Sequence, residues 1–270
     1  MAFIRALQRR LWLDSMDINS RSFCIIDIGV DMKRTRLGLA LVLAATLALA
    51  GLWAQDEDAA FTRKRQEMVE LQLRARDITD LKLLKAMGEV PRHLFVDTRL
   101  LGEAYEDYPL PIEEGQTISQ PYIVALMTQC LELKGGEKVL EGGTGSGYQA
   151  AVLDRMGARV YSIEIHDALA KKAATILKKL GYGRVEVKSG DGYFGWPEAA
   201  PFDAIIVTCA PDRIPDPLFE QLKEGGRMII PVGESGGTQA LTLVRKLQGK
   251  AKTEQISPVR FVPMTGAVKK

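Results

Sequence analysis

Short apolar segments alternate with segments of helical periodicity from residue 138 onward, and this alternation restricts the chain to few architectures. The predicted strands are residues 138–140, 159–163, 185–187, 204–207 and 228–230. The predicted helices between them are residues 148–156, 173–180 and 218–222. Strands that are separated by helices pair in parallel, because a parallel crossover is long enough to hold a helix. The pattern therefore predicts an α/β fold with a doubly wound, mostly parallel sheet.

The rest of the chain adds further elements to this prediction. Residues 241–247 and 259–262 are predicted to be later strands of the same sheet. An amphipathic helix is predicted over residues 61–88, and a second helix over residues 123–133. We therefore expect one domain at residues 61–270 that begins with an N-terminal helical extension.

The first sixty residues have a different character from this domain. A basic cluster at residues 33–36 precedes an uncharged, Ala/Leu-rich run that ends near Ala54. This order is typical of a secretory signal peptide over about residues 32–54. An uncleaved membrane anchor is the alternative, since about 20 apolar residues span a bilayer. We expect residues 1–60 to be an upstream segment that carries this signal or anchor, and the domain to be exported to the periplasm or outside the cell.

Charge and composition exclude several kinds of partner. The net charge is +2, but residues 1–36 carry +3, so the remainder carries −1. We therefore expect no nucleic-acid partner, which would require a basic face. The 3 Cys and 2 His have no metal-ligand spacing, so no metal site is predicted.

A glycine-rich loop follows the first predicted strand and precedes a helix. Gly143, Gly145 and Gly147 would let the backbone turn sharply and approach a ligand. The same spacing fits a dinucleotide-binding loop or an ordinary turn. Glu141, directly before the glycines, favours another ligand, because a carboxylate would repel a pyrophosphate. It would suit a cationic ligand such as the methionine portion of S-adenosylmethionine.

Two more acids follow the next two predicted strands. Glu164 ends the second strand, where a carboxylate can accept hydrogen bonds from both hydroxyls of a ribose. Asp191 follows the third strand and can accept the exocyclic amine of an adenine. In an open α/β sheet these strand ends meet at one edge. We therefore predict an S-adenosylmethionine site that includes these acids, the glycine loop with Thr144, and Gly192.

Several segments together resemble the protein-L-isoaspartate O-methyltransferase family. They are residues 90–96, 115–122, 139–149, 190–192, 200–205, 222–227 and 259–263, and the resemblance covers about residues 62–266. The Gln-Thr-Ile-Ser-Gln-Pro run at residues 116–121 is more particular to this family than the glycine loop. The resemblance implies a Rossmann-like methyltransferase fold, with residues 61–134 on the substrate side.

The resemblance also implies the reaction. The methyl group of S-adenosylmethionine would pass to the free α-carboxylate of an L-isoaspartyl or D-aspartyl residue in a damaged protein. The ester then closes to a succinimide, which hydrolyses partly to normal aspartate. The resemblance implies a cytoplasmic enzyme, in conflict with the export that residues 32–58 indicate.

One short run carries the expected acceptor site. Ser119 matches the active-site serine of the family, and Thr117 and Ile118 would lie beside it, between donor and peptide. We expect the Ser119 hydroxyl to orient the acceptor carboxylate, which is ionised at neutral pH and needs no general base. A simple N-cap of the helix after Pro121 is the structural alternative for Ser119.

The chain departs from the family pattern at three places. Gly142 stands where an apolar residue is usual, so donor binding is expected to be weaker. Glu113 and Glu114 are expected to add negative charge at the edge of the cleft, and Cys209 to act as a small apolar residue. The alternatives are a methyltransferase with another substrate, a dinucleotide-dependent oxidoreductase, and a non-catalytic protein that keeps the fold.

Overall fold

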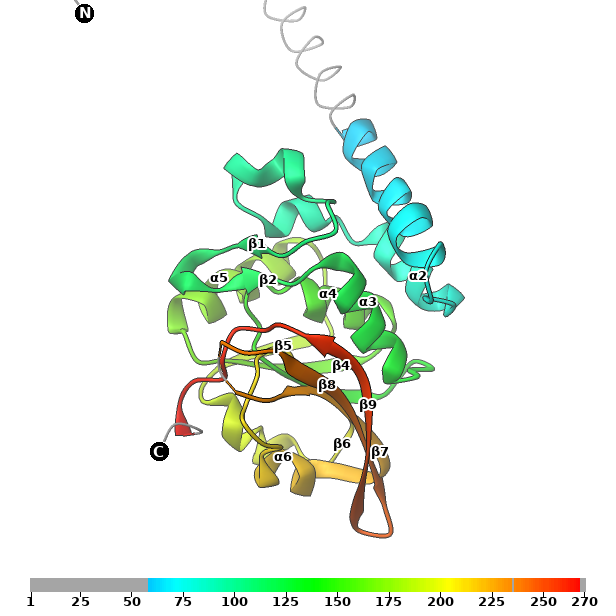
Figure 1. Cartoon of the computed structure of the whole chain (residues 1–270). Helices are drawn as coiled ribbons and strands as arrows, with labels where there is room; N and C mark the ends of the chain where they lie inside the picture. Colours follow the sequence, from blue (N-terminus) through cyan, green and yellow to red (C-terminus); the bar gives the residue numbers. More distant parts are fainter. Residues whose placement is uncertain (1–57, 235, 268–270) are drawn as a thin grey trace, which may run out of the picture. The chain divides into compact units, whose positions relative to one another are not determined.

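A computed structural model describes residues 58–234 and 236–267 of the chain (Figure 1). The signal peptide or anchor predicted over residues 32–54 lies outside these residues and stays a prediction. Within the described part, no helix is long and apolar enough to cross a membrane.

The centre of the domain is a seven-stranded sheet with the strand order β5-β4-β3-β6-β7-β8-β9. The strands are β3 (Lys138–Gly142), β4 (Arg159–Glu164), β5 (Val185–Ser189), β6 (Phe202–Val207), β7 (Leu222–Val232), β8 (Gln239–Leu247) and β9 (Lys250–Val259). The first five in this order pair in parallel, whereas β8 and β9 are antiparallel to their neighbours. The predicted α/β class with a doubly wound, mostly parallel sheet is confirmed.

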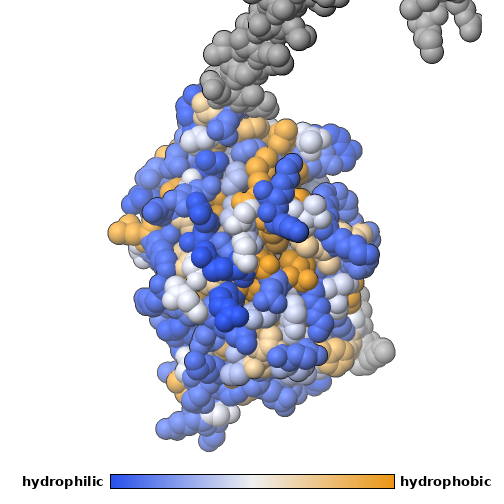
Figure 2. Space-filling model, turned by 180° about the vertical axis from the view of Figure 1, so that it is seen from behind, coloured by the Kyte–Doolittle hydropathy of each residue, from blue (hydrophilic) through white to orange (hydrophobic). Residues whose placement is uncertain are grey.

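At β6 both faces of the sheet are buried, which explains the unbroken apolar run in this strand. On the first face, Ala204 and Ile206 pack with residues of α2 (Leu81–Glu89), α3 (Pro121–Cys130), α4 (Tyr148–Arg155) and α5 (Asp167–Lys179). On the second face, Ile205 and Val207 pack with Leu218 of α6 (Asp216–Gln221). Figure 1 shows α3, α4 and α5 on one side of the sheet and α6 on the other. Most large apolar side chains are buried in this way, and the surface in Figure 2 is largely hydrophilic with a small hydrophobic area near its centre.

The N-terminal extension is divided into two helical parts. Residues 58–67 are α-helical and continue into a π-helical segment, η1 (Met68–Arg74). The chain then turns, and α2 begins after Asp80, whose carboxylate accepts hydrogen bonds from the N–H groups of Lys82 and Leu83. The prediction of one continuous helix over residues 61–88 was therefore wrong, because Asp80 caps a new helix.

The last strand also differs from the prediction. A strand was expected at residues 259–262, but β9 covers Lys250–Val259 and pairs with β8. Its residues up to Gln255 are polar or small and mostly exposed, so it has no apolar pattern and forms a charged edge of the sheet. Residues 260–267 instead return toward the end of β6, where Pro263 pairs with Ala210. This return path brings the C-terminal segment to the site described next.

A small antiparallel hairpin precedes the sheet. Its strands are β1 (Leu110–Pro111) and β2 (Thr117–Ile118), with Leu110 opposite Ile118. Three 3-10 segments belong to the same region: η2 (Arg92–Phe95), η3 (Thr98–Glu103) and η4 (Glu113–Gly115). Leu110 and Ile118 are buried in the core of the first face, so the hairpin is fixed to the domain beside α5 and α3.

Candidate active site

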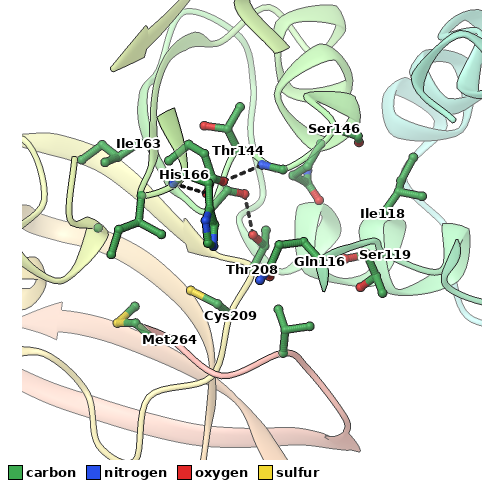
Figure 3. A pocket seen from close by; sticks show the side chains of 18 of the residues that line it. Gln116, Ile118, Ser119, Thr144, Ser146, Ile163, His166, Thr208, Cys209 and Met264 are labelled. Carbon is green, nitrogen blue, oxygen red and sulfur yellow. Dashed lines mark hydrogen bonds between the residues drawn. The ribbon is translucent and has the colours of Figure 1, made fainter. Parts of the chain in front are cut away.

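A pocket lies at the carboxyl ends of β3, β4 and β6 (Figure 3). Its walls come from four segments that are distant in the sequence: residues 116–119 around β2, the glycine loop at 143–146, residues 163–166 at the end of β4, and residues 262–265 near the C-terminus. Thr208 and Cys209, directly after β6, also line it. In Figure 3, Ile118 and Ser119 lie on one side of the pocket, and Ile163 and Met264 lie on the other.

The geometry of the glycine loop explains its glycines. Gly143, Gly145 and Gly147 have positive φ angles of 98°, 52° and 88°. These values lie in or near the left-handed region, which side chains disfavour. Gly143 also has no room for a side chain, since its Cβ would lie 2.5 Å from Oγ1 of Thr208. That hydroxyl donates a hydrogen bond of 2.6 Å to the carbonyl of Gly143 and so holds the loop against the end of β6.

Glu164 lines the pocket where the sequence predicts it. Its side chain is 5% exposed, and its carboxylate accepts hydrogen bonds from the N–H groups of Gly145 (2.9 Å) and His166 (3.0 Å). These contacts fix both oxygens at the pocket wall. Each carboxylate oxygen has a further lone pair, so the group can still accept hydrogen bonds from a ligand.

Asp191 is not on the pocket surface, although Gly192 beside it is. Its carboxylate accepts hydrogen bonds from the N–H groups of Tyr193 (2.9 Å) and Ala267 (2.8 Å). Gly266 has a φ of 96°, and a Cβ there would lie 2.3 Å from Asp191 Oδ2. The C-terminal segment therefore packs directly on this acid, a contact that the sequence did not reveal.

Glu141 lies behind the pocket wall and does not line the pocket. It is fully buried, and its Oε2 is hydrogen-bonded to the hydroxyl of Ser162. The Ser162 hydroxyl is in turn 2.6 Å from that of Thr144, which lines the pocket. Oε1 has no hydrogen-bond partner within the described residues. Burial raises the pKa of Glu141 to about 8, and the negative charge of Glu164 contributes to this rise.

The predicted acceptor residues lie together on the hairpin side of the pocket. Thr117, Ile118 and Ser119 all line it; Ile118 is buried and Ser119 is half-buried. The N-cap of α3 is Gln120, and Pro121 follows it as the first helical residue. Ser119 is therefore not the N-cap of this helix, and its hydroxyl is available at the pocket.

The pocket has an acidic character. Among the described residues that line it there is no Lys or Arg, whereas Glu164 is part of the wall. Burial, together with the charges of Glu164 and Asp191, raises the pKa of the Cys209 thiol to about 12. Cys209 therefore stays neutral, as expected for a small apolar residue. Such a pocket disfavours the phosphates of a dinucleotide and favours a ligand that carries positive charge.

The structure adds two features of the site that the sequence did not show. Met264 and Thr265 line the pocket, but no local pattern marks them because only the return of the C-terminal segment brings them there. One acid of the η4 segment is paired with a lysine of α5, and the other lies near the histidine before α5. Glu113 pairs with Lys172, and Glu114 lies 3.8 Å from Nδ1 of His166.

The comparisons with known proteins agree with this arrangement. Residues 63–269 match the model of the family described as protein-L-isoaspartate(D-aspartate) O-methyltransferase. The protein-L-isoaspartate O-methyltransferase of Opitutus terrae is 56% identical over 225 residues, which cover 83% of this chain and 97% of the relative. Protein-L-isoaspartate O-methyltransferase 2 of Shewanella sediminis is 53% identical over 230 residues, which cover 85% and 94%.

Solved structures give the same result. A structure of a protein-L-isoaspartate O-methyltransferase has a TM-score of 0.70 at 34% identity and covers 75% of this chain and 67% of that protein. A Plasmodium falciparum protein assigned the same activity was solved in complex with S-adenosyl-L-homocysteine. It has a TM-score of 0.65 at 26% identity, with coverage of 74% and 98%. The chain belongs to the protein-L-isoaspartate(D-aspartate) O-methyltransferase family.

Proposed function

We propose that this pocket transfers a methyl group from S-adenosylmethionine to the free α-carboxylate of L-isoaspartyl and D-aspartyl residues in damaged proteins. As a member of its family, the chain is an S-adenosylmethionine-dependent protein carboxyl methyltransferase. One observation carries the assignment of the site: the hairpin run Thr117–Ser119 and the acid-bearing wall of the glycine loop line the same pocket. A donor on one wall and an acceptor on the other would thus be close together.

The residues on the loop side fit the donor. The carboxylate of Glu164 would accept the ribose hydroxyls, and Thr144 and the glycines would surround the methionine portion. Asp191 and Gly192 would lie toward the adenine, with Met264 of the C-terminal segment nearby. When bound, the donor supplies an electrophilic methyl group on a positively charged sulfur, which suits a pocket wall that contains Glu164 and, among the described residues, no Lys or Arg.

The residues on the hairpin side fit the acceptor. An isoaspartyl α-carboxylate is already ionised at neutral pH, so the site requires no general base. The Ser119 hydroxyl would donate a hydrogen bond that orients this carboxylate toward the donor. Catalysis then comes from positioning and from the exclusion of water by the hairpin and by Ile118. In this arrangement residues 61–134 form the substrate side of the enzyme.

A peptide pair tests the proposal. The purified chain is incubated with labelled S-adenosylmethionine and either an isoaspartyl peptide or the same peptide with normal aspartate. We expect label only in the isoaspartyl peptide, as an ester that is lost again at mildly alkaline pH. Equal labelling of both peptides would indicate another substrate. Failure to bind S-adenosylhomocysteine at millimolar concentration in calorimetry would instead indicate a non-catalytic protein.

A further inference from the structure

Three buried side chains form a continuous chain of hydrogen bonds from the pocket wall into the core. Thr144 lines the pocket and is hydrogen-bonded to Ser162, and Ser162 is hydrogen-bonded to Glu141. All three are nearly or fully inaccessible: Thr144 is 3% exposed, and the other two are 0% exposed. Glu141 and Ser162 are opposite each other in the paired strands β3 and β4, so their side chains project to the same face of the sheet.

This series of hydrogen bonds can run in two directions, because each hydroxyl carries one proton. When Glu141 is ionised, Ser162 donates to it, Thr144 donates to Ser162, and the Thr144 oxygen can only accept hydrogen bonds on the pocket side. When Glu141 is protonated, it donates to Ser162, Ser162 donates to Thr144, and the Thr144 hydroxyl proton is available to the pocket. The protonation state of a group in the core thus sets what the pocket wall offers to a ligand.

The surroundings of Glu141 favour the protonated direction when no cation is bound. The neighbouring strand β4 places Glu164 near it, whose negative charge raises its pKa, and β6 contributes the apolar Ile206 opposite it. The hydrogen bond that Ser162 donates lowers the pKa of Glu141, but burial outweighs it, and no Lys or Arg of the described residues adds to the lowering. A buried carboxylate with an unpartnered oxygen and no cation is costly, and taking up a proton removes this cost.

We propose that Ser162 is a positioning residue that couples Glu141 to the donor site, and that Glu141 releases its proton when a cationic donor binds. The O–H bond of the Glu141 carboxyl group breaks, Ser162 and Thr144 each accept one proton and pass one on, and a buffer base takes up the proton. Glu141 is then ionised while the positive donor occupies the pocket. The inference rests on the proposed donor site.

The coupling distinguishes donor from product by charge. S-adenosylmethionine carries one positive charge more than S-adenosylhomocysteine, whose sulfur is a neutral thioether. Only the donor therefore compensates an ionised Glu141 in the same buried region. After methyl transfer this compensation is lost and Glu141 regains its proton, so the unmodified chain holds the product no more tightly than a chain with a permanently neutral residue at this position.

Calorimetry tests this coupling. Binding of each ligand is measured near pH 7 in buffers of different ionisation enthalpy, which gives the number of protons released. The α-amino group of the donor itself titrates at about pH 8, so the quantity of interest is the difference between the unmodified chain and Glu141→Gln. Gln has nearly the shape of the protonated acid and cannot ionise. We expect the unmodified chain to release up to one more proton than Glu141→Gln with the donor, and no such excess with the product.

Affinity and spectroscopy give independent readouts. The ratio of the donor affinity of the unmodified chain to that of Glu141→Gln should rise as the pH increases toward about 8, by up to about tenfold per pH unit. Donor binding should also remove the infrared C=O band of a buried protonated carboxyl group, a test that needs no variant. Ser162→Ala should weaken this coupling, and Ser162→Thr, which keeps the hydroxyl, should restore it.

Equal proton release by the unmodified chain and Glu141→Gln would overturn the inference, as would a carboxyl band that donor binding leaves unchanged. If the Ser162→Ala variant still released the full number of protons, Ser162 would have no role in the coupling. A chain that shows no binding heat with either ligand would overturn the donor site itself, and this outcome is distinct from binding without proton release.

Discussion

Gly142 offers a direct test of how the end of β3 determines stability. It is the last residue of β3 and pairs with Ile163 and Val207. Its φ lies outside the left-handed region, and an added Cβ would lie 3.7 Å from Cγ1 of Val207, an ordinary contact distance. Gly142→Ala should therefore be accommodated without strain and should fill space in the core of the second face.

The magnitude follows from two contributions. Burying one methyl group stabilises by about 0.8 kcal/mol, and restricting the unfolded backbone by replacing glycine adds about 0.4–1 kcal/mol. We expect Gly142→Ala to raise the free energy of unfolding by about 1–2 kcal/mol. In a domain of this size this corresponds to a rise of roughly 2–8 °C in the Tm. Thermal and urea unfolding without ligand would measure it.

The neighbouring glycine provides a matched control. Gly143 has a φ of 98°, and its Cβ would lie 2.5 Å from Oγ1 of Thr208. Gly143→Ala should therefore destabilise by about 1–3 kcal/mol and weaken the binding of S-adenosylhomocysteine, while Gly142→Ala should not weaken this binding. If both substitutions changed stability in the same direction, the reasoning from backbone angle and available space would be refuted.

Three further predictions concern the acids and the serine of the site. Because burial raises the pKa of Glu141 from 4.5 to about 8, the stability that its protonation confers is fully present below pH 4.5 and lost as the pH rises to 8. Denaturation of the ligand-free chain at pH 5 and 8 should show this loss, and Glu141→Gln should reduce it by a few kcal/mol; parallel losses in both chains would contradict it. Ser119→Ala should lower kcat/KM for an isoaspartyl peptide by about 10–100-fold and leave the Kd of S-adenosylhomocysteine unchanged, so a weakened Kd would argue for a role in folding. Glu164→Gln should raise that Kd by about tenfold or more in calorimetry, whereas Glu186→Gln on the exposed side of β5 should have no effect.

The sheet and the loop side of the pocket could be predicted because their signals are local. A parallel strand that is buried on both faces consists of an unbroken apolar run, as in β6, and the carboxyl ends of such strands meet at one edge. The position of Glu164 follows from this rule alone. The order of glycines after β3 likewise reflects backbone angles that the loop itself requires.

The remaining features depend on contacts between distant segments. The break between η1 and α2 comes from the capping carboxylate of Asp80, which interrupts an otherwise continuous helical periodicity. The exposed edge strand β9 has no apolar alternation, and the contact of Ala267 with Asp191 joins residues 76 positions apart. No pattern within a short window of sequence contains information about such a contact.

The direction of the Glu141 side chain could have been predicted from its position in the strand. Its place at the end of β3 suggests direct contact with a ligand, but successive side chains of a strand point to opposite faces. Val139 packs in the core of the first face and Leu140 in that of the second. Glu141 therefore points to the same face as Val139, beneath the helices, and not out of the strand end toward the ligand. Hydrogen bonds connect the acid to the pocket through Ser162 and Thr144. An acid before a glycine loop thus identifies the site. The face of the sheet to which the acid points determines whether the acid contacts the ligand directly or acts through a buried neighbour.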